Sequence, residues 1–173
     1  MTMTCATLIR ILKYIKESFG KGHVFCDRGN IGIIGYLDTE WARDASDRRS
    51  TSGYCAFIGG NLISWKSKKK NVVARSSTED EYRAMAHAAC ELLWFNHLLY
   101  ELHFCEADPM ELVCDNHTAL HLSSNSVFDE RTKYIEVDCH FLRDKITTGI
   151  IKTSFVNSRD QLADLFTKSL QKH

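Results

Sequence analysis

Long apolar runs are missing from the 173-residue sequence, and none approaches the roughly 20 residues that a membrane-spanning helix needs. The N-terminus also lacks the basic, apolar and small-residue regions of a signal peptide. Net charge is zero, because 22 Lys+Arg balance 22 Asp+Glu. Bulk charge therefore does not draw the chain to nucleic acid or acidic membrane, and any such attraction must come from local patches. We expect a soluble intracellular protein.

Cysteine pairs and prolines are equally scarce. The seven cysteines stand singly, without the paired spacing of a zinc site or the density of a disulfide scaffold, so we expect most to be reduced and buried. The single proline, Pro109, leaves few rigid breaks, and there is no internal repeat or low-complexity tract. The length suits one domain of ordinary size with a short attached segment.

The most informative stretch begins at Ser76. Ser76 and Glu79 have the spacing of a capping box, in which each side chain satisfies a backbone N–H group of the other residue. Apolar residues then recur at helical spacing to about Glu101. Glu81 falls at the edge of that apolar stripe, where an acid must be paired, protonated or bound to a metal.

A mixture of strands and helices is predicted around this long helix. The expected strands cover residues 22–25, 31–38, 53–58, 61–65, 110–115 and 150–156, and the other expected helices cover residues 5–17, 116–122, 133–147 and 162–166. Gly59-Gly60 is a two-residue hairpin signal. The order strand, long helix, strand implies a crossover that sets the strand after Pro109 parallel to an earlier one. Ser158 and Gln161 match a second capping box, expected to open the last helix.

Carboxylates stand where these elements could bring them together. Two apolar strands end on Asp38 and Asp115, Glu81 points inward from the start of the long helix, and Asp164 is a fourth candidate. Such a cluster would be unstable through like-charge repulsion unless cations neutralised it. Oxygen ligands of this kind suit Mg²⁺ or Mn²⁺, and two such ions about 4 Å apart support phosphodiester hydrolysis.

Each acid also has a structural interpretation. Asp38 and Asp115 could be strand-end turns or caps, and Asp164 could serve only the helix dipole. Glu81 could be a surface residue paired with Arg75 or Arg83.

Seven short motifs follow one another along the chain. They lie at residues 37–42, 48–54, 64–69, 76–82, 114–116, 130–133 and 162–164. In order and number they closely resemble the ribonuclease H domain of copia-type LTR retrotransposon Pol polyproteins, over about residues 31–170. The resemblance implies an α/β, ribonuclease H-like fold, with a mixed five-stranded sheet of three antiparallel strands and then parallel strands, flanked by helices. Residues 1–28 resemble the tail of the reverse transcriptase connection segment, and residues 29–173 would form the ribonuclease H domain.

The same resemblance implies a function. It is endonucleolytic hydrolysis of the RNA strand of RNA–DNA hybrids, by two-metal-ion catalysis with Mg²⁺, for which Mn²⁺ can substitute. Carried over position by position, the catalytic and metal-binding residues are Asp38, Glu81, Asp115 and Asp164. The implied partners are the hybrid and the reverse transcriptase portion of the same polyprotein, with no membrane. The implied location is cytoplasmic, in virus-like particles, with the nucleus as a second compartment. No polymerase palm precedes the domain, so DNA synthesis is not expected.

Basic residues near these motifs are candidates for the hybrid's phosphates. They are Arg48, Arg49, Lys66, Lys68 and Lys69. Contacts to phosphates position a nuclease without reading sequence. Selectivity for a hybrid would come from groove shape and the RNA 2′-OH, which Asn116 could contact. The lysine run could instead be a solvated loop.

Two other functions compete with this one. A transposase or integrase of the same fold would carry a helix glutamate after its second strand aspartate, but no glutamate lies near residue 150 and Glu81 precedes Asp115. A catalytically decayed or recruited module, binding nucleic acid or a polymerase partner, stays open because Asp129 and Tyr134 replace histidines common in the family. His117 and His121 have helical zinc-ligand spacing without an evident third ligand, so surface histidines are the better interpretation.

Overall fold

A computed structural model describes residues 5–42, 47–71, 73–74, 76–104, 108–124 and 136–168. Its elements are α1 (Cys5–Glu17), β1 (Ile33–Glu40), β2 (Thr51–Ile58), β3 (Asn61–Lys69), α2 (Ser77–Glu101), β4 (Met110–Cys114), α3 (His117–Ser124), α4 (Glu136–Thr147), β5 (Ile151–Phe155) and α5 (Asp164–Thr167). Arg75, Asp129, Tyr134 and the motif at residues 130–133 lie outside the described residues.

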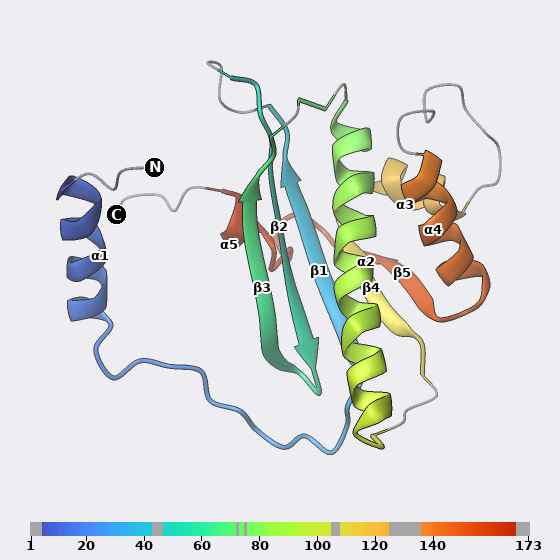
Figure 1. The fold of residues 1–173 in the computed structure, drawn as a ribbon, viewed down its shortest axis with the longest axis horizontal. Coiled ribbons are helices and arrows are strands. Elements are labelled where there is room, and N and C mark those ends of the chain that lie inside the picture. The colour runs from blue at the N-terminus through green and yellow to red at the C-terminus, as the bar shows by residue number, and fades with distance from the viewer. Residues whose placement is uncertain are drawn as a thin grey trace.

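One mixed sheet forms the centre of the molecule (Figure 1). Its strand order is β3-β2-β1-β4-β5. The β1–β2 and β2–β3 pairs are antiparallel, whereas β1–β4 and β4–β5 are parallel. Gly59 and Gly60 connect β2 to β3 with φ angles of +57° and +74°, the left-handed values that a two-residue hairpin turn needs. The predicted five-stranded sheet, its hairpin and its parallel strand are confirmed.

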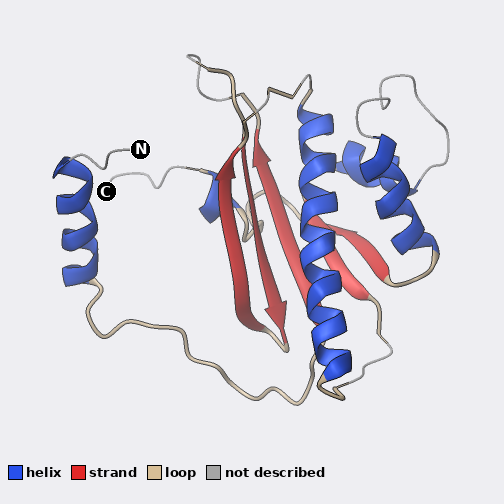
Figure 2. Cartoon of the chain, viewed as in Figure 1, coloured by secondary structure: helices blue, strands red, loops and turns tan. Residues whose placement is uncertain are grey.

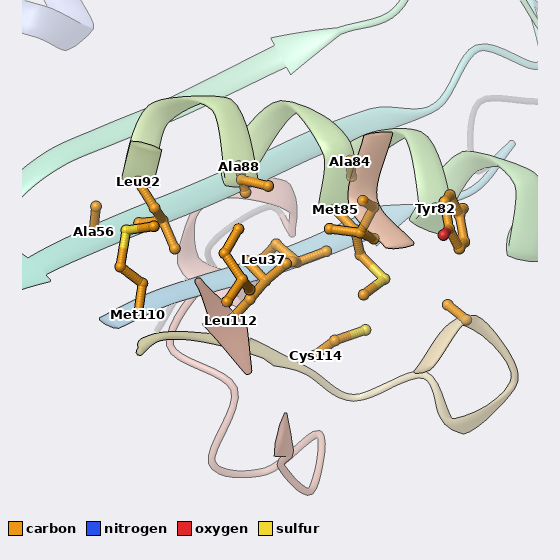
Figure 3. Close-up of a cluster of buried hydrophobic side chains, with 14 of the residues drawn as sticks. Leu37, Ala56, Tyr82, Ala84, Met85, Ala88, Leu92, Met110, Leu112 and Cys114 are labelled. Carbon is orange, nitrogen blue, oxygen red and sulfur yellow. The ribbon is translucent and has the colours of Figure 1, made fainter. Parts of the chain in front are cut away.

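Helix α2 covers one face of the sheet and buries most of the core (Figures 2 and 3). Met85 and Leu92 of α2 are fully buried against Leu37 of β1 and Leu112 of β4. The helix lies so close to β1 that a Cβ atom on Gly35 would come within 2.9 Å of Leu92. Helices α3 and α4 pack beside α2.

The opposite face is covered at one end by the four-residue α5. A Cβ atom on Gly53 of β2 would lie 2.7 Å from Phe166 of α5, so the absence of a side chain there allows the approach. This contact brings α5 to the end of the sheet where the candidate acids were predicted.

Residues 5–32 lie outside the sheet (Figure 1). Helix α1 forms as predicted, but its apolar stripe is exposed, with Leu12 65% and Ile15 55% accessible. The predicted strand at residues 22–25 is wrong, because the chain there has no regular secondary structure. Instead, the Asn61 side chain bonds both backbone groups of Cys26, at 2.9 Å each, which replaces a strand partner.

Free thiols are found at every described cysteine. Cys55, Cys114 and Cys139 are buried, whereas Cys5, Cys26 and Cys90 are exposed. The prediction that most cysteines are buried is therefore wrong for this part of the chain.

Candidate metal centre

Parallel pairing places two of the predicted acids at one edge of the sheet. Asp38 lies on β1, opposite Gly53 of β2, and Asp115 directly follows β4. Because β1 and β4 run in the same direction side by side, their carboxyl ends lie at the same edge. The prediction that the first strand ends at Asp38 is wrong, since β1 continues to Glu40, which pairs with Thr51.

Glu81 enters this edge from the first turns of α2. Ser76 caps the helix, and its Oγ accepts a hydrogen bond from the backbone N–H of Glu79 at 3.1 Å, as the capping pattern predicts. The Glu81 side chain is only 4% exposed, so the surface interpretation is wrong. Arg83 pairs with Glu79, with 3.0 Å between Nη2 and Oε1.

Burial and charge make Glu81 an unusual acid. Burial, with the charges of Asp38 and Asp115, raises the pKa of Glu81 to about 8, against the lowering effect of a hydrogen bond from Cys114. The Cys114 Sγ lies 3.3 Å from Glu81 Oε1. Ligand atoms of Glu81, Cys114 and Asp115 all lie within 4.8 Å of one another.

Asp38 is buried as well, at 5% exposure. Burial raises the pKa of Asp38, the Thr167 hydroxyl lowers it, Asp164 and Asp115 raise it further, and Lys168 lowers it. Thr167 donates its hydroxyl hydrogen bond directly to Asp38 Oδ2. Asp164, at the start of α5, pairs with Lys168 through one carboxylate oxygen. Asp38 is thus close enough to Asp115 and Asp164 for their charges to raise its pKa, as Asp38 and Asp115 raise that of Glu81.

The capping box predicted at Ser158 and Gln161 is wrong. The Ser158 hydroxyl donates to Asp115 Oδ2 at 2.6 Å, and Gln161 Oε1 accepts from the backbone N–H of Ala163 at 3.2 Å. Helix α5 begins at Asp164 without a side-chain cap. The Ser158 hydroxyl, which the local pattern assigned to a helix cap, therefore makes a tertiary hydrogen bond to Asp115 instead.

Sequence reasoning missed four residues that contact the acids. They are Cys114, Ser158, Thr167 and Lys168. A signal was present for two of them, because Thr167 and Lys168 follow Asp164 at i+3 and i+4, the spacing that puts side chains on one helical face. Ser158 and Cys114 gave no such local signal.

The predicted basic residues do not form one continuous cluster on the surface. Strand β3 contains the lysine run that was expected to follow it, and β3 is an edge strand of the sheet. Lys66 and Lys68 line a cleft of about 400 Å³ beside α2. Side chains alternate along a strand, so Lys69 lies on the other face, where its Nζ is 3.0 Å from Asp47 Oδ2. Arg49 also approaches Asp47, at 3.9 Å.

Asn116 and Arg48 occupy turns. Asn116 Oδ1 accepts from the backbone N–H of Ala119 at 3.0 Å, which caps α3 next to Asp115. Arg48 is exposed, with a φ of +52°. Both residues thus lie in loops rather than in the sheet.

The donor set at the acid edge suits a hard divalent cation. Three or four carboxylates could offer oxygen ligands, which Mg²⁺ and Mn²⁺ prefer. Asp164 Oδ1 is buried and has no hydrogen-bond partner among the described residues. A buried carboxylate oxygen without a donor is costly unless a cation or water satisfies it, so Asp38, Glu81, Asp115 and Asp164 fit a metal centre.

None of the described helices is both long enough and apolar enough to cross a bilayer.

Solved structures share this arrangement of strands and helices. LC11-RNase H1, solved in complex with an RNA/DNA hybrid, aligns with a TM-score of 0.58 at 14% identity, covering 78% of this chain and 93% of that one. The fold is therefore the ribonuclease H fold, as the sequence motifs predicted.

Proteins related in sequence narrow the family to which the chain is similar. The Retrovirus-related Pol polyprotein from transposon RE2 of Arabidopsis thaliana is 41% identical over 166 residues, 95% of this chain. The corresponding polyprotein from transposon TNT 1-94 of Nicotiana tabacum is 34% identical over 159 residues, 91% of this chain. No family model matches the chain. The homologues of this chain are copia-type retrotransposon Pol polyproteins, and it spans 11% and 12% of the length of these two.

Proposed function

We propose that this chain is a ribonuclease H that hydrolyses the RNA strand of RNA–DNA hybrids during retrotransposon reverse transcription. The observation that carries the proposal is the convergence of Asp38, Glu81, Asp115 and Asp164 at one edge of a ribonuclease H fold. A protein of the same fold, LC11-RNase H1, was solved with an RNA/DNA hybrid bound. The homology to retrotransposon Pol polyproteins supplies a setting in which such hybrids arise.

The four acids would hold two Mg²⁺ ions, for which Mn²⁺ can substitute. When bound, such ions activate a water molecule and stabilise the leaving oxygen of the phosphodiester. The chain's own part is to gather the carboxylates and fix their orientation. Thr167 and Ser158 do this by donating hydrogen bonds to Asp38 and Asp115, the support that ligating carboxylates need.

The hybrid would be held by residues around this edge. The phosphates would be contacted from both faces of β3 and from the loop before β2, by Lys66, Lys68, Lys69, Arg48 and Arg49. Contacts of this kind fix the register of a duplex without reading its sequence.

Discrimination between RNA and DNA would fall to Asn116. Its Oδ1 caps α3, and its amide NH₂ group would be the donor to the 2′-OH of the RNA strand. The position next to Asp115 would put this contact beside the scissile phosphate.

We further propose that residues 1–28 are the tail of the reverse transcriptase connection segment and residues 29–173 the ribonuclease H domain. The exposed stripe of α1 would then pack against the reverse transcriptase portion of the same polyprotein. In that setting the domain acts in cytoplasmic virus-like particles, with the nucleus as a second compartment.

A gel assay tests the activity. The purified chain is incubated with a labelled RNA–DNA hybrid or with duplex RNA, with and without Mg²⁺. We expect cleavage of the RNA strand of the hybrid only when Mg²⁺ is present. Cleavage of duplex RNA at the same rate would contradict the proposed specificity. Absence of cleavage, together with no heat of Mg²⁺ binding by calorimetry, would favour the decayed module.

A further inference from the structure

A thiol stands among the carboxylates of the metal centre. Cys114 is the last residue of β4, is fully buried, and has its Sγ 3.3 Å from Glu81 Oε1. The backbone N–H of Asn116 donates to the same sulfur at 3.3 Å. In Figure 3 the sulfur points toward the end of α2 where Tyr82 lies, not along the strand toward Leu112. The thiol is therefore held against the acids.

Magnesium does not account for this sulfur. Mg²⁺ and Mn²⁺ select oxygen ligands, whereas thiolates select softer ions such as Zn²⁺ and Cd²⁺. Zn²⁺ accepts a mixture of sulfur and carboxylate oxygen at bond lengths of about 2.0 to 2.3 Å, which places neighbouring tetrahedral ligands about 3.3 to 3.8 Å apart. The ligand atoms of Glu81, Cys114 and Asp115 lie within 4.8 Å of one another, so small side-chain shifts would close a three-ligand site.

We propose that Glu81, Cys114 and Asp115 form a binding site for Zn²⁺ or another thiophilic divalent cation, which excludes Mg²⁺ and inhibits the enzyme. The inhibitory half rests on the proposed ribonuclease H function, because Glu81 and Asp115 also belong to the magnesium centre. Binding replaces the proton on the Cys114 thiol by a metal–sulfur bond and releases that proton to solvent. No oxidation or reduction is involved.

Two further observations, independent of the cysteine, point to a cation at this position. Glu81 is a nearly completely buried acid facing Asp38 and Asp115, an arrangement that a divalent ion would neutralise. Asp164 contributes a buried oxygen with no hydrogen-bond partner among the described residues. The acids at this edge of the sheet therefore call for positive charge, and the Cys114 thiol lies against two of them, Glu81 and Asp115. The identity of the ion decides which ligands bind.

Cadmium binding tests the site without reference to activity. Cd²⁺ gives an ultraviolet thiolate-to-metal absorption band. The band is titrated in a background where serine replaces the exposed cysteines Cys5, Cys26 and Cys90, and also Cys105. We expect saturation at one equivalent of Cd²⁺, loss of the band in Cys114→Ser, and its retention in the matched variant Cys139→Ser, whose thiol is equally buried. Circular dichroism checks that each variant is folded.

Zinc inhibition tests the consequence. The rate of hybrid cleavage at fixed Mg²⁺ is measured against rising Zn²⁺, and each variant is normalised to its own rate without Zn²⁺. We expect Cys114→Ser to raise the half-inhibitory Zn²⁺ concentration at least tenfold and Cys139→Ser to leave it unchanged. Retention of the cadmium band in folded Cys114→Ser, or no band in the parent protein, would overturn the proposal. If the band is present but no hybrid is cut, the site stands and the ribonuclease function fails; if hybrid is cut but no band forms, the reverse holds.

Discussion

The hydroxyl of Ser158 lies 2.6 Å from Oδ2 of Asp115, although 43 residues separate them along the chain. Four residues earlier, on β5, the Ser154 hydroxyl makes the same kind of bond to the Glu111 side chain on β4. The first bond supports a proposed metal ligand, whereas the second joins β5 to β4. The two serines therefore form a matched pair for separating metal support from structural support.

Ser158→Ala is expected to weaken Mg²⁺ binding about tenfold, because loss of a partner to a ligating carboxylate typically costs 10- to 100-fold in metal affinity or activity. The Mg²⁺ concentration for half-maximal cleavage of the hybrid measures the effect. Ser154→Ala should leave that concentration unchanged. Equal shifts in the two variants would show that the Ser158 bond is structural only.

Asp115→Asn should abolish cleavage and leave the fold intact. It removes the negative charge of a proposed metal-binding carboxylate, while the side chain keeps nearly the same volume. Asp160→Asn is the control, since Asp160 is exposed in the loop before α5. Cleavage rate and far-ultraviolet circular dichroism are compared for both. Full activity of Asp115→Asn would refute the assignment of the site.

Stability without metal should fall as pH rises from about 4.5 to about 8. The pKa of Glu81 rises from its ordinary value of 4.5 to about 8 on folding, so the folded state binds the extra proton in this interval. That stabilisation is complete below the unfolded pKa and is lost as pH passes the folded pKa, at a cost on the order of 5 kcal/mol. Denaturant unfolding in EDTA at several pH values measures it.

Glu81→Gln should remove most of that slope, leaving the smaller contribution of Asp38, whose pKa is also raised by burial. Mg²⁺ should likewise flatten the slope in the parent protein, because the ion stabilises the ionised carboxylates. Glu101→Gln, at the exposed end of α2, should retain the full slope. A slope unchanged in Glu81→Gln would assign the pH dependence to other groups.

Ser76→Ala should lower the free energy of unfolding by about 1 kcal/mol, because the Ser76 hydroxyl accepts the backbone N–H of Glu79 and caps α2. Glu79→Ala keeps that backbone bond and loses the ion pair with Arg83, so it should cost only about 0.3 to 0.5 kcal/mol. Chemical denaturation of the two variants ranks the effects. The reverse ranking would mean that the Glu79 side chain, not the Ser76 hydroxyl, holds the start of the helix.

Lys70→Met should destabilise the protein by about 3 to 5 kcal/mol, because it leaves the completely buried Asp80 without its cation. Lys70 also donates to the backbone oxygen of Asp80 at 3.0 Å, which ties the end of β3 to the residue before Glu81. The double variant Lys70→Met, Asp80→Leu should recover most of the loss. Lys68→Met, at an exposed position near the end of β3, should cost about 0.5 kcal/mol or less.

Local sequence patterns were enough to predict an element where residues of a single segment determine it. Three features follow from patterns among neighbours in sequence. The start of α2 at Ser76 follows from a capping pattern, the hairpin from Gly59-Gly60, and the strand that contains Leu112 from an apolar run after Pro109. The same patterns set some ends wrongly. β1 passes Asp38 because Thr51 offers a pairing partner for Glu40, and β3 includes the lysines because β2 pairs with it to the end.

The sequence by itself predicted which acids would come together, through the order of its motifs around Asp38, Glu81, Asp115 and Asp164. Only the tertiary structure decided what surrounds them. Ser158 bonds Asp115 instead of capping a helix, and Thr167 bonds Asp38, which is 129 residues away in the sequence. Cys114 contacts Glu81 because β4 ends beside α2. The physical reason is that buried carboxylates of like charge are stabilised by any hydrogen-bond donor that folding brings near them. Contacts of this kind join distant segments, so they leave no local pattern in the sequence.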